Sequence, residues 1–125
     1  MDVNAVFRGG GRSLEFLDQI NKASLVMLAE TGIIPQSLAR CIAQGIAQVI
    51  AEDQGHAPKH SADYLDYEPR LLAAAGPDAS RLHTGRSRQD ISSTIARMNL
   101  RDGVLREIEA LIVAREKVVA VAEQH

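Results

Sequence analysis

Apolar residues recur every seven positions through the last third of the chain, and this spacing constrains the fold more than any other feature. With Ile95 and Ile108, the recurring positions form a broad apolar stripe on a helix. The spacing predicts one continuous helix over residues 90–124, about 50 Å long at the usual rise per residue. Because a 125-residue globule has no need of so long a helix, we expect the stripe to pack on other chains or on further parts of a longer protein. The recurring residues are Ile91, Met98, Leu105, Ile112 and Val119, with a second series at Val104, Leu111 and Val118.

Three shorter helical patterns precede this stripe, over residues 13–32, 35–55 and 64–75. Each carries apolar residues at intervals of three and four. Ser13 is the expected N-cap of the first. Gly45, inside the second, indicates either a close approach of two helices or a tolerated small residue. The segment that follows the third pattern, residues 76–88, is expected to be a loop without helical character. It forms most of an expected signature loop over residues 76–90.

Composition favours an all-α fold and excludes some functions. Hydrophobic residues make up 46% of the chain but aromatic residues only 3%, so the core is expected to be aliphatic. The 14 basic and 16 acidic side chains give a net charge of −2, which argues against nucleic-acid binding through bulk charge. No apolar run approaches the roughly 18 residues of a membrane span. We expect a small N-terminal helical domain, residues 1–88, that leads into the start of a long central-bundle helix, residues 89–125.

The single cysteine, Cys41, excludes an internal disulfide and a cysteine-based metal cage, which is typical of a reducing compartment. The predicted location is therefore the cytoplasm. Cys41 itself is expected to be a small core residue. His56 and His60 have the spacing of a two-histidine metal site, but Pro58 lies between them and no third ligand is evident, so no metal is expected.

The chemistry of the chain is concentrated in residues 82–90, Leu-His-Thr-Gly-Arg-Ser-Arg-Gln-Asp. These donors come just before the long helix, where unpaired backbone N–H groups and the helix dipole favour an anion. Arg86 and Arg88 are one residue apart and should point in different directions. One of them is then free to bind a carboxylate, and the other serves the structure or a second group. Taken singly, each arginine also fits a surface ion pair, and Ser87 fits a helix N-cap.

Residues 82–90 resemble the first signature region of argininosuccinate lyase, within the superfamily that includes fumarase, aspartase and adenylosuccinate lyase. Residues 18–34 and Glu68 agree with the same alignment. The resemblance implies largely helical chains several times longer than this one. It also implies a homo-oligomer, a tetramer around a central bundle of very long helices, and no nucleic-acid or membrane partner.

The same resemblance implies a carbon–nitrogen lyase of arginine biosynthesis that eliminates fumarate from argininosuccinate or a related N-succinyl amino compound. A base removes a proton next to a carboxylate, an aci-carboxylate forms, and the C–N bond breaks. No catalytic residue is expected in this segment, because the family's base and mobile serine loop lie in later segments and each site combines three subunits. The chain alone is therefore expected to be inactive, and no cofactor is implied. The predicted substrate-binding residues are His83, Thr84, Arg86, Ser87, Arg88 and Gln89, of which His83, Thr84 and Arg86 would shape the loop.

Three positions depart from the family pattern. Gln89 stands where the family usually has Asn, and Ser24 and Tyr64 replace two histidines. Tyr64, like Tyr67, is expected to pack with its hydroxyl exposed. The departures support a second hypothesis, a non-catalytic structural or assembly protein on the same scaffold, as among lens crystallins. A third is a helical interaction module whose stripe forms a coiled coil, although acidic residues four positions after the stripe residues make a poor seam. These acidic residues are Asp102, Glu109 and Glu116.

Overall fold

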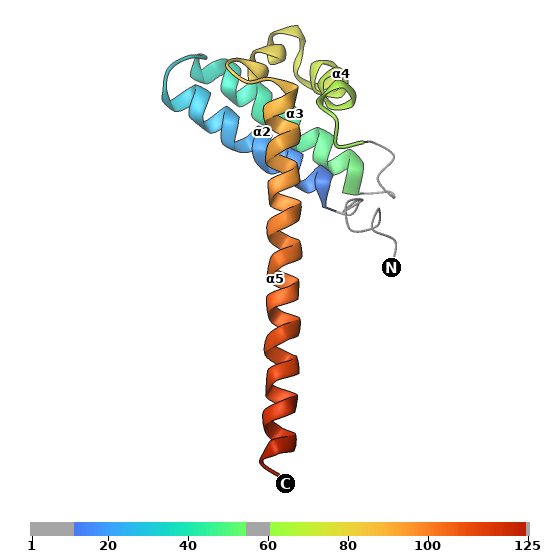
Figure 1. The fold of residues 1–125 in the computed structure, drawn as a ribbon. Coiled ribbons are helices and arrows are strands. Elements are labelled where there is room, and N and C mark those ends of the chain that lie inside the picture. The colour runs from blue at the N-terminus through green and yellow to red at the C-terminus, as the bar shows by residue number, and fades with distance from the viewer. Residues whose placement is uncertain (1–11, 55–60, 125) are drawn as a thin grey trace.

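The computed structural model describes residues 12–54 and 61–124, and within them the chain is helical, without strands. Figure 1 shows a cluster of short helices, from which one long helix extends alone. The predicted all-α fold is confirmed. None of the described helices has a stretch both long and apolar enough to span a bilayer. The elements are α2 (Ser13–Glu30), α3 (Gln36–Gln54), α4 (Tyr64–Ala75), the 3-10 helix η1 (Pro77–His83) and α5 (Arg88–Ala122).

The helix ends follow the local sequence closely, with one exception at α2. Ser13 is the first residue of α2 rather than its N-cap, and Arg12 occupies the cap position without a side-chain cap bond. The predicted cap is wrong, and the Ser13 hydroxyl instead accepts a hydrogen bond from Asn99 Nδ2 of α5 at 3.2 Å. At the end of α4, Gly76 adopts a φ of 83°, a left-handed value that favours glycine, and ends the helix.

The segment predicted as a loop over residues 76–90 is mostly helical, and that prediction is wrong. Residues Pro77–His83 form η1, and α5 already begins at Arg88, so only Gly76 and residues 84–87 of this segment lie outside helices. Pro77 fixes a helical φ at the first position. Ala79 and Leu82 are both fully buried, and their spacing of three places them on one side of a 3-10 helix.

The core lies where α3 packs between α2 and α4. Gly45 of α3 permits this contact, since a Cβ atom there would lie 2.7 Å from Ala75 Cβ and 3.1 Å from Leu71 Cδ1. The close-approach interpretation of this glycine is confirmed. The buried side chains are largely aliphatic, as predicted, and include Leu17, Leu28, Ile34, Ile42, Ile46, Val49, Leu71 and Leu82.

Three side chains near this core differ from expectation. Cys41 is exposed, because it lies on the rim of the α3–α4 contact, where its thiol donates to Ala75 O at 3.3 Å. Tyr64 and Tyr67 are buried with their hydroxyl oxygens, since α4 turns both rings toward α2 and η1. The predictions of a core cysteine and of exposed tyrosine hydroxyls are therefore wrong. His56 and His60 lie outside the described residues.

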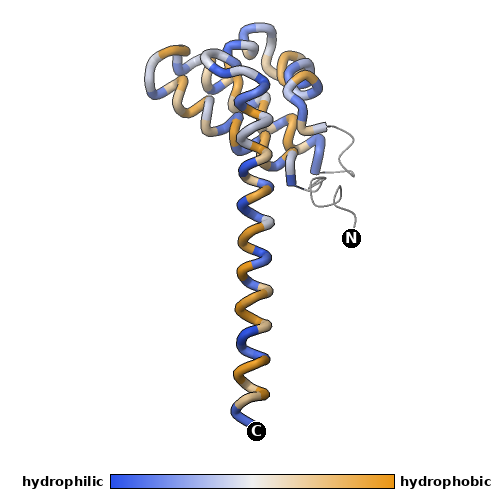
Figure 2. Tube along the Cα trace, in the orientation of Figure 1, coloured by the Kyte–Doolittle hydropathy of each residue, from blue (hydrophilic) through white to orange (hydrophobic). Residues whose placement is uncertain are grey.

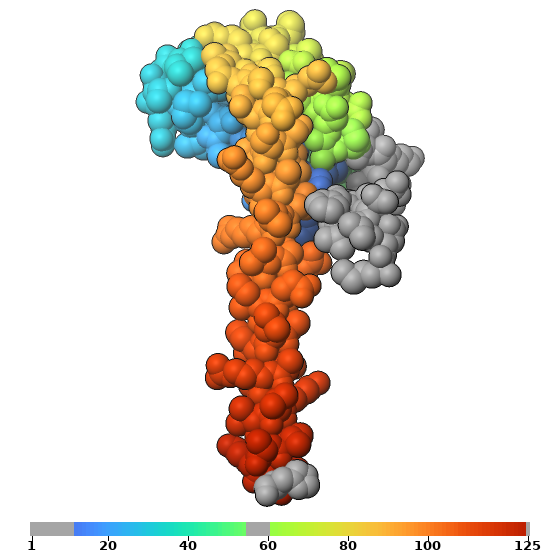
Figure 3. All heavy atoms as spheres, in the orientation of Figure 1, coloured from blue at the N-terminus to red at the C-terminus, as the bar shows by residue number. Residues whose placement is uncertain are grey.

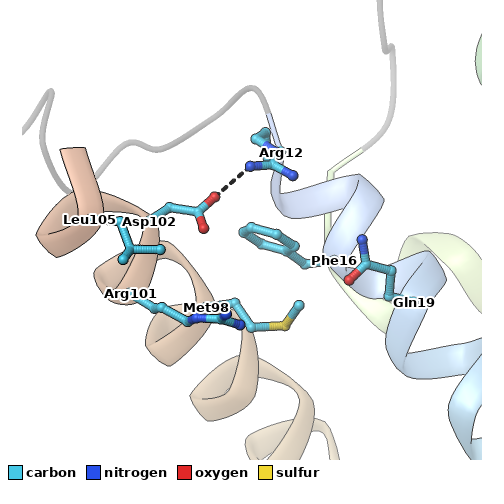
Figure 4. A pocket seen from close by; sticks show the side chains of 7 residues that line it. All are labelled: Arg12, Phe16, Gln19, Met98, Arg101, Asp102 and Leu105. Carbon is cyan, nitrogen blue, oxygen red and sulfur yellow. Dashed lines mark hydrogen bonds and ion pairs between the residues drawn. The ribbon is translucent and has the colours of Figure 1, made fainter. Parts of the chain in front are cut away.

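Helix α5 is fastened to the other helices only along its first turns. Ile91 and Ile95 are buried in the common core. Arg12 Nη1 then pairs with Asp102 Oδ2 at 2.6 Å, and the Arg12 guanidinium lies 5.3 Å from the centre of the Phe16 ring (Figure 4). These groups border a hollow of about 180 Å³ between α2 and α5, which none of residues 82–90 lines.

Beyond Asp102, α5 makes no hydrogen bond or ion pair with the other described helices, and Leu105 still borders the hollow beside α2. We call residues 104–122 of α5 the stem. Its large apolar side chains are between 46% and 69% exposed, and they alternate with polar residues along its length (Figure 2). In the space-filling view the stem stands apart from the other helices (Figure 3). The predicted long helix is confirmed. Its apolar stripe packs on the described core at Ile91, Ile95 and Met98 and is exposed along the stem.

The carboxyl group of Asp18, on α2, makes stability depend on pH. Its Oδ1 atom is buried and accepts no hydrogen bond from the described residues. Burial raises the pKa of Asp18 to about 6, with Asp53 and Glu15 adding to the rise and Lys22 and Arg70 opposing it. Because the folded chain holds this proton more tightly than the unfolded chain, the stabilisation is complete below about pH 4. It is lost as the pH rises through about 6.

We therefore predict that Asp18→Asn flattens the stability profile between pH 4 and 6. At pH 7.5 the variant should be more stable than the wild type by on the order of 1–2 kcal/mol. Urea unfolding across this pH range measures both effects. Asp78→Asn, at an exposed carboxylate of η1, is the matched control and should leave the profile unchanged. An Asp18→Asn profile that parallels the wild type would contradict the assignment.

Candidate anion-binding site at the start of helix α5

The four residues of the loop 84–87 turn the chain from η1 into α5. Thr84 closes the end of η1, because its backbone N–H and its hydroxyl both donate to Arg81 O, at 3.1 and 2.7 Å. Gly85 follows with a φ of 75°, a conformation that other residues rarely adopt. The N–H of Arg86 then donates to His83 O at 3.4 Å. The loop is thus a tight turn closed by its own backbone.

Ser87 is the N-cap of α5 and forms a reciprocal pair with Asp90. Ser87 Oγ accepts from Asp90 N at 3.2 Å, while Ser87 N and Oγ both donate to Asp90 Oδ2, at 2.7 and 2.8 Å. These bonds lower the pKa of Asp90, the backbone N–H contributing most. The N-cap interpretation of Ser87 is confirmed, and its hydroxyl is engaged by its own helix. The N–H groups of Arg88 and Gln89 have no acceptor among the described residues, as is usual in a first helical turn.

Arg86 points inward, beneath the loop. Its Nη1 donates to Ser24 Oγ at 2.8 Å and its Nη2 to Asn21 Oδ1 at 2.6 Å, both on α2. The guanidinium also lies 5.2 Å from the ring centre of Tyr64 on α4, within the range of a cation–π contact. Burial lowers the pKa of Arg86, but a guanidinium remains charged near neutral pH.

Arg88 points outward, with no partner among the described residues. It is exposed on the first turn of α5 and makes no hydrogen bond or ion pair within the part of the chain that the structure describes. Arg86 likewise has no carboxylate partner there, so the surface ion-pair interpretation of the two arginines is wrong. The prediction that the two arginines point in different directions is confirmed, and the binding of a carboxylate by one of them stays a prediction.

Of the remaining predicted residues, Gln89 lies on the exposed surface with Arg88, and His83 lies beside Tyr64, which also contacts Arg86. The exposed Gln89 donates from Nε2 to Ser93 Oγ at 3.3 Å, one turn along α5. His83 stacks on the Tyr64 ring, with the ring centres 4.3 Å apart and the planes inclined by 16°. Burial lowers the pKa of His83, and the charges of Arg86 and Arg88 lower it further while Glu68 opposes them, so the neutral imidazole predominates at pH 7.

Sequence reasoning identified the loop but missed one of the groups that hold it. Asn21 is completely buried, although it was not among the predicted residues. It lies four positions from both Leu17 and Leu25, on the apolar side of α2. A polar residue in such a stripe needs a partner, and this signal was available in the sequence.

The chain is similar to proteins named argininosuccinate lyase. It is 35% identical over 105 residues to one from Haloarcula marismortui, 37% identical over 107 residues to one from Ralstonia pickettii, and 32% identical over 108 residues to one from Methanosarcina mazei. No family model matches the chain. No solved structure matches it.

These alignments cover most of this chain but a small part of its relatives. They include 82% to 85% of the chain, and the chain spans only 21% to 23% of the length of the three relatives. The chain is therefore homologous to argininosuccinate lyases over most of its own length, and it is consistent with an N-terminal portion of such a protein.

Proposed function

We propose that this chain supplies an N-terminal part of the active site of an argininosuccinate lyase-type carbon–nitrogen lyase. The reaction would eliminate fumarate from argininosuccinate or a related N-succinyl amino compound. One observation carries the proposal: Arg88 presents an unpaired guanidinium beside two free N–H groups at the capped start of α5. The names of the homologous proteins support the same reaction.

The geometry suits a carboxylate that gains charge during the reaction. When a base removes the proton beside a carboxylate, the electron pair enters that group as an aci-carboxylate. The pair then forms the double bond of fumarate while the C–N bond breaks, and the departing nitrogen takes a proton. Fixed donors that meet the extra charge lower the barrier. Arg88 can fork onto two carboxylate oxygens, and the helix dipole adds to its effect.

The other predicted residues support this group. Arg86 adds a positive charge that no described carboxylate neutralises, and the neutral imidazole of His83 adds none. Thr84 and Ser87 fix the turn and the helix start, and Gln89 borders the same surface. We assign no base to this chain. Later segments and neighbouring subunits would supply it, with residues 1–88 as the N-terminal domain and residues 89–125 as the start of a central helix.

The stem supports the further proposal of a homo-oligomer, a tetramer built on the long helices. Its exposed apolar series, which includes Leu105, Ile108, Ile112 and Val119, offers a continuous surface to another helix. The single cysteine is compatible with a cytoplasmic protein. A non-catalytic scaffold is the second candidate, and the observation that favours it is the contact of Gln89 with Ser93, which turns its amide along α5 instead of toward Arg88.

We predict that a whole protein containing this chain releases fumarate from argininosuccinate, measured by ultraviolet absorbance. Arg88→Ala should lower kcat/KM by roughly 100-fold or more, because it removes a charged donor from the developing dianion. Arg97→Ala, at an exposed position of the same helix, is the control and should retain activity. Full activity of Arg88→Ala would refute the site. Absence of fumarate release from any N-succinyl amino compound would favour the scaffold.

We also predict that the 125-residue chain self-associates through the stem. Sedimentation should give a mass above that of one chain, and Ile108→Asp should return it to the monomer by placing a charge in the apolar series. Glu107→Gln, at an exposed neighbouring position, should leave the mass unchanged. A monomeric wild type at high concentration would contradict a role of the stem in assembly.

A further inference from the structure

Arg86 is a partly buried cation, and its hydrogen-bond partners among the described residues are neutral groups. Its two terminal nitrogens donate to Asn21 and Ser24, and its third neighbour is the face of the Tyr64 ring. Asn21 is fully buried and Tyr64 is 2% exposed. Such a charge loses part of its hydration without gaining an ion pair. Charge pairing therefore does not explain why the guanidinium points inward, and its directed hydrogen bonds indicate a role in geometry.

The loop 84–87 has few other attachments to the helices around it. Among the described residues, Thr84 bonds only to the end of η1, Gly85 has no side chain, and Ser87 bonds only to Asp90 and Ile91 of its own helix. Among the described hydrogen bonds and ring contacts, Arg86 alone joins this loop to α2 and α4. Farther along, α5 is held by the buried Ile91 and Ile95, so Arg86 is the attachment at the point where the helix begins.

We propose that Arg86 is a positioning residue that locks the loop 84–87 onto α2 and α4, and thereby fixes the direction of the first turn of α5 and of Arg88. Ser24 and Tyr64, two of the three positions that depart from the family pattern, both contact this guanidinium. Ser24 and Tyr64 hold the guanidinium in place, so the residue types at these two positions affect how the loop is supported. This proposal depends on the proposed function only for the identity of the ligand that Arg88 would bind.

Substitutions of Arg86 can separate the effect of its positive charge from the effect of its planar shape. Two donors of a planar guanidinium reach Asn21 and Ser24 at once, whereas a lysine keeps the charge but lacks the rigid fork. Arg86→Lys should therefore keep the electrostatic influence on His83 and release the loop. Arg86→Gln should lose both. A residue that served only general stability would not separate these two effects.

Amide hydrogen exchange and histidine titration by NMR, on the 125-residue chain, test the lock. In Arg86→Gln and Arg86→Lys, the amides of Arg86, Asp90 and Ile91 should exchange about tenfold faster, because each bonds within the turn that the guanidinium holds. Those of Ile46 and Val49, in the core of α3, should change much less. The pKa of His83 should rise in Arg86→Gln and stay low in Arg86→Lys.

Ser24→Ala removes one of the two hydrogen bonds of the guanidinium and should give a smaller acceleration of exchange at the same amides. This variant tests the proposal even if Arg86→Gln does not fold. Arg97→Gln, which removes an exposed charge of α5, is the control and should change neither readout. Protection restored by lysine, or equal acceleration in loop and core, would overturn the lock. No substrate enters this experiment, so its failure is distinct from failure to release fumarate.

Discussion

The inward fork of Arg86 is the interaction on which the arrangement of the site depends. It joins a four-residue turn to residues of two helices that are more than twenty positions from Arg86 in the sequence. The capping pair of Ser87 and Asp90 then begins α5 at a defined residue. With Arg86 facing inward, Arg88 is left on the outer side of the first helical turn. A hydrogen-bonded anchor and an unpaired cation are thus produced by two arginines separated by a single serine.

The fold could be predicted from the sequence where the signal was local. Apolar spacing indicated α2 to α5, and Gly76–Pro77 marked the end of α4. The 3-10 helix was not predicted, because its apolar residues Ala79 and Leu82 are three positions apart in a single short segment. Longer α-helical patterns do not have this form. Cys41 and Ser13 were misplaced because their environments are set by contacts with distant helices.

For the site, the sequence located the loop and the separation of roles between its arginines, but not which arginine points inward. That depends on Asn21, Ser24 and Tyr64, whose proximity to the loop is a property of the packed helices. For the stem, by contrast, the sequence pattern alone was sufficient. Its exposed apolar series was predictable from spacing alone, and it indicates that the described chain leaves a helix face unpaired. The site and the stem lie at opposite ends of the same helix, so assembly and substrate binding would share one rigid element.

The most direct test of the central claim is whether the start of α5 binds a dicarboxylate through Arg88. We predict that titration of the 125-residue chain with succinate, at constant ionic strength, shifts the NMR signals of the Arg88 and Gln89 amides in a saturable manner. Arg88→Ala should abolish the shifts, and Arg97→Ala should preserve them. Equal shifts in wild type and Arg88→Ala, or shifts that move with ionic strength alone, would contradict an anion site at this helix start.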